Sequence, residues 1–231
     1  MKHCSVEQYS EEWFRLRCGI PTASSFDKII TPKERRPSKS SVKYAYRLLA
    51  ERVLGKPDID PVETEYMRRG LVMENEAALW YAVTRGVEVV NGGFVTTDDG
   101  RIGCSPDRLV GDDGLLEIKC LGAPGHVAAL FGDTDSYELQ VQAQLWICER
   151  SWADRLYYHP DLTPLVERVL PDLELHADLD VALRQFCERL DEMEAELRAK
   201  ATNVSMGWPR KWIGRPPTVR RAKQRPILFW G

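Results

Sequence analysis

The stretch CSPDRLVGDDGLLEIKC, residues 104–120, decides the fold of this chain. Its two halves have the composition of paired β-strands, and GDDG between them is typical of a turn. Along the second half, Glu117 and Lys119 project to one face, and the apolar Leu116 and Ile118 project to the other. Taken alone, this is also the pattern of a surface hairpin with a Glu–Lys pair in solvent. The other acids of the chain bear on that choice.

An acid on the first of these strands, Asp107, can meet Glu117 on the second. Two carboxylates that converge repel each other, so such a pair requires a cation. Oxygen ligands favour a hard divalent ion, Mg²⁺ or Mn²⁺. Lys119 is placed to orient or help deprotonate a metal-bound water and to stabilise a charged transition state. This set of groups predicts metal-assisted hydrolysis of a phosphodiester.

Length and composition predict one domain and exclude a membrane protein. The chain has 231 residues, of which 43% are hydrophobic and 29% are charged, and we expect a single domain over 1–205 with a basic, Trp- and Pro-rich tail at 206–231. No apolar run reaches the length of a membrane span, and no secretory signal is recognisable, so we expect a cytoplasmic protein. The six cysteines follow no disulfide or zinc pattern.

The charge distribution is segregated although the net charge is only −3. Lysines and arginines dominate 28–56 and 208–231, whereas acids dominate 171–198. Segregation of this kind can give a near-neutral protein a basic face for nucleic acid. Solvated loops and tails explain it equally well, and the sequence leaves both open.

Hydrophobic periodicity predicts helices that alternate with strands. The helix expected at 41–55 places Val42, Tyr46, Leu49 and Val53 near one face, and the one at 64–86 places Glu74 beside an apolar stripe. The predicted helices are 10–17, 41–55, 64–86, 136–150 and 178–200, and the predicted strands are 87–97, 100–106, 107–112, 114–120, 152–160 and 165–171. This order favours an α/β fold, a central mixed β-sheet flanked by helices, with an N-terminal helical part.

The residues at this point resemble a known family. Pro106-Asp107 followed by Glu117-Ile118-Lys119 matches the PD-(D/E)-x-K nuclease signature. Across roughly residues 10–200, five blocks occur in the order found in phage lambda-type exonuclease and its YqaJ-like viral recombinase relatives: WFRLRCGIPTAS, GLVMENEA, CSPDRLV, LLEIKC and LQVQAQLWI. The resemblance implies a restriction-endonuclease-like core and a Mg²⁺-dependent 5′→3′ exonuclease, with Mn²⁺ as a substitute. The resemblance implies that such an enzyme acts on the ends of double-stranded DNA and leaves 3′ overhangs.

The resemblance also implies a metal centre. Asp107 and Glu117 resemble the family's metal-binding carboxylates, and the backbone carbonyl of Ile118 is a further ligand. Lys119 is similar to the catalytic lysine. Glu74 is similar to the helical acid that completes the site, through metal-bound water.

Further roles follow from the same resemblance. Gln140 matches the helical glutamine near the attacking water, with Gln142 as a less favoured neighbour. Arg17 matches the arginine that binds the 5′-phosphate of the digested strand, and Ser24 and Ser105 are similar to supporting phosphate contacts. The family assembles as a ring-shaped homotrimer, and its product suits a single-strand annealing protein as partner.

Two alternatives remain open. One is an endonuclease of the restriction or repair type, which would use the same metal chemistry on an internal bond. The other is a non-catalytic DNA-binding module, which would need a degenerate site. Every catalytic position that can be matched carries a competent residue, which favours an enzyme.

Overall fold

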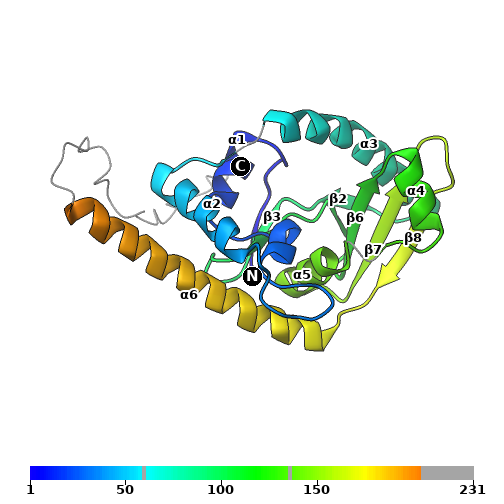
Figure 1. Cartoon of the computed structure of the whole chain (residues 1–231). Helices are drawn as coiled ribbons and strands as arrows, with labels where there is room; N and C mark the ends of the chain where they lie inside the picture. Colours follow the sequence, from blue (N-terminus) through cyan, green and yellow to red (C-terminus); the bar gives the residue numbers. More distant parts are fainter. Residues whose placement is uncertain (59–60, 135–136, 204–231) are drawn as a thin grey trace, which may run out of the picture.

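Strand β6 (Gly114–Cys120) lies at the centre of a five-stranded sheet whose order is β2-β5-β6-β7-β8 (Figure 1). It pairs antiparallel with β5 (Arg108–Val110) and parallel with β7 (Trp152–Tyr158). The edge strands β2 (Val89–Asn91) and β8 (Leu165–Val169) are both antiparallel to their neighbours. The predicted strand pair and the predicted mixed sheet are therefore confirmed.

The structure, a computed structural model, describes residues 1–58, 61–134 and 137–203, without the side chains of 61–71 and 201–203. A second, three-stranded sheet has the order β1-β3-β4 and is formed by Lys2–Cys4, Phe94–Thr96 and Gly103–Cys104. The helices are α1 (Glu11–Arg17), the 3₁₀ helix η1 (Ala23–Lys28), α2 (Ser41–Leu54), α3 (Pro61–Arg85), α4 (Ala123–Leu130), α5 (Glu138–Cys148) and α6 (Leu173–Asn203). The predicted tail, 206–231, lies outside the described residues.

The two faces of β6 enter two different apolar clusters. Leu116 and Ile118 pack with Ala77 and Tyr81 of α3. Leu115 enters the larger cluster, to which α5, η1, α2 and α6 contribute. Figure 1 shows α3 and α5 on opposite sides of the strands. Each face of the sheet is thus covered, which is why β6 is nearly continuously apolar around its charged residues.

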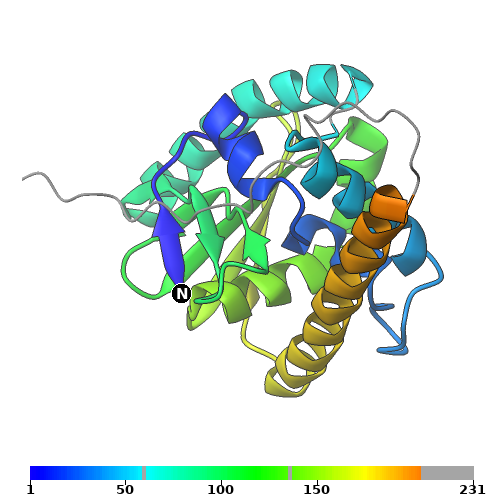
Figure 2. The same ribbon diagram turned by 90° about the vertical axis from the view of Figure 1, so that its left-hand side faces the viewer.

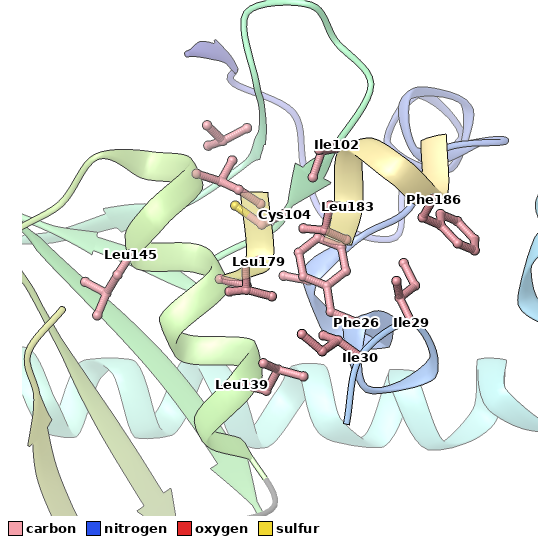
Figure 3. Packing of buried hydrophobic residues seen from close by; sticks show 14 of the residues in the cluster. Phe26, Ile29, Ile30, Ile102, Cys104, Leu139, Leu145, Leu179, Leu183 and Phe186 are labelled. Carbon is pink, nitrogen blue, oxygen red and sulfur yellow. The ribbon is translucent and has the colours of Figure 1, made fainter. Parts of the chain in front are cut away.

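The larger cluster holds α6 against the rest of the molecule. Leu179, Leu183 and Leu190 follow one stripe of α6 and are fully buried. Figure 3 shows Leu179 and Leu183 beside Phe26 of η1. Burial of each such leucine contributes about 1.5–3 kcal/mol, so this stripe fixes α6 along α2 and α5, as Figure 2 shows for α2.

The face predicted for α2 was wrong in part. Val42 and Tyr46 are 57% and 60% exposed, whereas Tyr44 and Leu48 are buried. The ring of Tyr44 stacks on Phe186 of α6, with ring centroids 5.8 Å apart. Both stripes of the helix are apolar in sequence, so the position of α6 decides which one is buried.

The basic segment 28–56 meets the acidic segment 171–198, most of which lies in α6. Arg35 NH2 lies 2.9 Å from Asp172 Oδ2, and Arg52 NH1 lies 2.8 Å from Asp191 Oδ1. Part of the segregated charge is therefore neutralised within the fold, and these two arginines do not form a free basic face.

Two further features concern the environment of the protein. No described helix is both long and apolar enough to cross a membrane. Cys104, Cys148 and Cys187 are buried thiols, and Cys4, Cys18 and Cys120 are partly buried.

Candidate active site

A cavity of about 450 Å³ lies beside β6 and is lined by all nine predicted site residues. Side chains from α1, η1, α3, β6 and α5 converge on it, together with the segment just before β5. The nine are Arg17, Ser24, Glu74, Ser105, Asp107, Glu117, Ile118, Lys119 and Gln140. Gln142 does not line this cavity.

Asp107 is anchored to the next strand. Its Oδ2 accepts a hydrogen bond of 2.6 Å from the backbone N–H of Ile118. Burial raises the pKa of Asp107 well above its ordinary value, and the carboxylates of Glu117 and Glu74 raise it further. The surroundings of Asp107 therefore disfavour its ionised form unless a cation lies beside it.

Glu117 is buried, with 2% of its surface exposed, and both of its carboxylate oxygens are held. Oε1 accepts from Lys119 Nζ at 2.7 Å and from Gln140 Nε2 at 2.6 Å. Oε2 accepts from Gln144 Nε2 at 2.7 Å. Three donors fix the direction in which this carboxylate faces the cavity.

Lys119 is an ammonium in this environment. Burial alone would lower the pKa of Lys119, but the carboxylates of Glu117 and Asp107 outweigh it and raise that pKa above its ordinary value. Nζ also donates to Gln140 Oε1 at 3.1 Å and lies 4.5 Å from the centroid of the Tyr137 ring. Of the three roles predicted for it, orienting the water and stabilising charge suit an ammonium group, and proton abstraction does not.

Glu74 has a partner that the sequence did not indicate. Arg108 NH1 donates to Glu74 Oε1 at 2.7 Å and to the backbone oxygen of Asp107 at 2.6 Å. Burial raises the pKa of Glu74, and the Arg108 guanidinium opposes that rise. Arg108 thus links α3 to the start of β5. In the sequence, its position directly after Asp107 is the feature that could have pointed to a role in the site.

Arg17, the last residue of α1, contributes a second part of the cavity lining. Its guanidinium carbon lies 4.0 Å from the centroid of the Trp13 ring, and its nitrogens donate to Ser105 Oγ and Thr22 Oγ1, both at 3.3 Å. Within the described part of the chain no carboxylate lies at ion-pair distance from it. Burial lowers the pKa of Arg17, yet a guanidinium stays charged in proteins. A half-buried cation that pairs with no carboxylate of the described residues is costly, so this part of the cavity favours an anion.

Ser105 belongs to the same part of the cavity lining as Arg17. Its Oγ accepts from Trp13 Nε1 at 2.8 Å as well as from Arg17. Both lone pairs are then used, and the hydroxyl hydrogen can be donated to an incoming oxygen. Ser24 lines the same cavity and also a smaller one of about 260 Å³, which shares Trp13 and Arg17 with it.

The glutamines of α5 divide between two tasks. Gln140 and Gln144, four residues apart, face Glu117. Gln142 faces away: its Nε2 donates to the backbone oxygen of Leu170, and its Oε1 accepts from the backbone N–H of Asp172, both at 2.9 Å. The weaker expectation for Gln142 was wrong, and Gln144 was missed although the four-residue spacing indicated it.

The donor set fits a divalent cation with few protein ligands. Across the described residues, no three His, Cys, Asp or Glu side chains form a metal-binding group. What the cavity offers is Asp107, Glu117 and the backbone of Ile118. Burial raises the pKa of Asp107, and the nearby Glu117 and Glu74 carboxylates raise it further, so a cation at this position would relieve an unfavourable charge. Mg²⁺ commonly binds through one or two carboxylates and keeps several waters, so the residues present suit it.

Comparison with solved structures places the fold among exonucleases. The alkaline exonuclease LHK-Exo from Laribacter hongkongensis is 29% identical and has a TM-score of 0.75, with 85% of this chain and 100% of that chain covered. The structure of LHK-Exo in complex with dAMP matches to the same extent. A phage related exonuclease from Haemophilus somnus 129PT shares the fold at 16% identity and a TM-score of 0.62, over 77% and 96% of the two chains. The core is of the PD-(D/E)XK type.

Among curated proteins no match was found. The model of the YqaJ-like viral recombinase domain, however, matches residues 12–151. That range is more than half of the chain. It contains all the residues that line the cavity except Gln8 and Tyr9. The chain belongs to the YqaJ-like viral recombinase family.

Proposed function

We propose that this protein is a Mg²⁺-dependent exonuclease that degrades one strand of linear double-stranded DNA from its 5′ end. One observation carries the proposal: a carboxylate pair with a lysine lines the same cavity as an arginine that pairs with no carboxylate of the described residues. The first group suits a cation and the second an anion. A cation held by the carboxylates would bind one phosphodiester of a DNA strand, and the arginine would bind the terminal phosphate of the same strand.

The residues divide the work of hydrolysis. Asp107, Glu117 and the Ile118 carbonyl would hold Mg²⁺, which supplies Lewis-acid activation of the phosphodiester and of water. Lys119 donates from its ammonium group to a phosphate oxygen and so stabilises the charge that develops there. Gln140, which contacts both Glu117 and Lys119, positions these groups and the attacking water.

The polarity of digestion rests on Arg17. Its planar guanidinium suits phosphate oxygens, and Ser105 and Ser24 add hydroxyl donors. A 5′-phosphate held there brings the first phosphodiester of the same strand toward Lys119. Nucleotides are then released from the 5′ end, and 3′ single-stranded overhangs remain. The similarity to LHK-Exo, an alkaline exonuclease whose structure is also known with dAMP, supports this reading.

We further propose, from the family resemblance, a ring-shaped homotrimer and a single-strand annealing protein as recombination partner. One described surface supports assembly: Val72, Leu79 and Val83 lie on one line of α3 and are 73%, 65% and 74% exposed. A contact with another subunit would cover these three side chains. Light scattering coupled to size-exclusion chromatography measures the mass, and a monomer would contradict the trimer.

The function is tested with end-labelled linear duplex and Mg²⁺, with polarity and product size read together. Mononucleotides released from 5′ ends are expected. Cleavage of a covalently closed circular duplex would instead favour the endonuclease alternative. Absence of nucleotide release with both Mg²⁺ and Mn²⁺ would favour a non-catalytic DNA-binding module.

A further inference from the structure

We infer that Gln144 is a positioning residue of the metal centre: it holds the Glu117 carboxylate in the orientation that binds the cation. The inference rests on the proposed function, because it assumes that Glu117 is a metal ligand. Gln144 does not line the cavity, so its action on a bound ion passes through Glu117.

The contacts of Gln144 are one-sided. Its Nε2 donates to Glu117 Oε2 at 2.7 Å and lies 3.5 Å from the backbone oxygen of Ser105. Its Oε1 is buried and has no hydrogen-bond partner in the part of the chain that the structure describes. A buried amide oxygen without a donor is unfavourable, so packing alone does not explain a glutamine at this position. The contact with Glu117 does.

Two glutamines on one face of α5 donate hydrogen bonds to the two carboxylate oxygens of Glu117. Gln140 donates to Oε1 and Gln144 to Oε2, and four residues separate them on α5. Lys119 also donates to Oε1. Among the described residues Gln144 is therefore the side-chain donor to Oε2. Its loss leaves the carboxylate oriented by the donors to Oε1 alone.

The neighbouring Gln142 provides a matched control. It is 3% exposed, Gln144 is 1% exposed, and both lie on α5. Gln142 uses both ends of its amide for the fold: besides its backbone partners Leu170 and Asp172, its Oε1 lies 2.9 Å from His176 Nε2. It makes no contact with Glu117 within the described residues. Within one turn of α5, Gln142 therefore serves the fold, and Gln144 contacts the proposed metal ligand Glu117.

The test compares Gln144→Met with Gln142→Met, since methionine keeps the volume and removes the amide. Mn²⁺ affinity is measured on the full-length protein by electron paramagnetic resonance without DNA, and the melting temperature is measured in EDTA. Gln144→Met is expected to weaken Mn²⁺ binding by about 10- to 100-fold, as the loss of groups that orient metal ligands does, with little change in melting temperature. Gln142→Met is expected to lower the melting temperature and to keep Mn²⁺ affinity.

Gln144→Asn, one methylene shorter, is measured alongside in case the methionine variant does not fold. Wild-type Mn²⁺ affinity retained in Gln144→Met, or in Gln144→Asn where only that variant folds, would overturn the inference. If the wild type binds no Mn²⁺, the proposed function fails instead. Equal loss of affinity in Gln142→Met and Gln144→Met would show that α5 acts only as a scaffold and would also overturn the inference.

Discussion

The backbone N–H of Ile118 donates to Oδ2 of Asp107 at 2.6 Å, so the two halves of the PD-(D/E)-x-K motif are joined by the protein itself. This bond sets the distance between Asp107 and the strand that carries Glu117 and Lys119. The site is therefore shaped before a cation or DNA arrives, a condition for efficient electrostatic stabilisation of a transition state.

Substitution of Asp107 or Lys119 by alanine should abolish hydrolysis and leave DNA binding in place. The first removes a metal ligand and the second a donor to the phosphate, and the loss of such a group reduces the rate by about 10²-fold or more. Nucleotide release is measured beside a mobility-shift assay with the same duplex. Full activity in both variants would contradict the site assignment.

Divalent metal should stabilise the protein without DNA. A ligand present at 100 times its Kd stabilises the fold by about 2.7 kcal/mol, and the raised melting temperature should return to its lower value with EDTA. Scanning calorimetry with Mg²⁺, Mn²⁺ and EDTA measures this. An unchanged melting temperature in millimolar Mn²⁺ would contradict metal binding.

Asp107→Asn should make the metal-free protein more stable than the wild type at neutral pH. Because burial and neighbouring carboxylates raise the pKa of Asp107, the fold disfavours its ionised form. The metal-free wild type therefore loses stability as pH rises from the ordinary pKa of an aspartate to the raised one. Urea titrations in EDTA at several pH values should show this loss in the wild type and a smaller one in the variant. If the free energy of unfolding changed with pH in the same way in the wild type and in Asp107→Asn, this prediction would be contradicted.

Arg17→Lys should weaken the preference for 5′-phosphorylated ends by about 10-fold or more, because a lysine cannot offer the same pair of donors. Initial rates on linear duplex with and without a 5′-phosphate measure the preference. Arg15→Lys is the control, since Arg15 lies on the same helix α1 and outside both cavities that Arg17 lines. A preference kept in Arg17→Lys, or absent in the wild type, would show that the phosphate end is misassigned.

Arg52→Ala should lower stability rather than DNA affinity. Arg52 donates to the backbone oxygen of Gly19 at 2.7 Å and pairs with Asp191 and Glu194 of α6. Loss of these contacts should cost about 1–3 kcal/mol in the free energy of unfolding. Lys43→Ala is the control, because Lys43 is exposed on the same helix. If both variants lost duplex affinity equally and Arg52→Ala kept its stability, segment 28–56 would instead be assigned to DNA binding.

The strand pair and most of the site could be predicted because their signals are local. The alternation of β6 assigns Glu117 and Lys119 to one face, and the spacing to Asp107 requires only a hairpin. Gln144 had a local signal as well, the four-residue spacing from Gln140, but only the direction in which α5 packs separates it from Gln142.

Other features depend on partners distant in sequence. Tyr44 is buried and Tyr46 exposed because α6 packs on one side of α2, and nothing within α2 selects that side. The pairing of Arg35 with Asp172 crosses the chain in the same way. The sequence showed the two opposite charge runs but not that they meet.

The parallel pairing of β6 with β7 has a consequence for synthesis in the cell. The motif strand gains its second neighbour only after α4, α5 and residues 152–158 have been translated. A partly synthesised chain on the ribosome carries the sequence of a nuclease without the sheet that positions it. The order of the elements thus means that the sheet around the motif can be completed only once translation has passed β7.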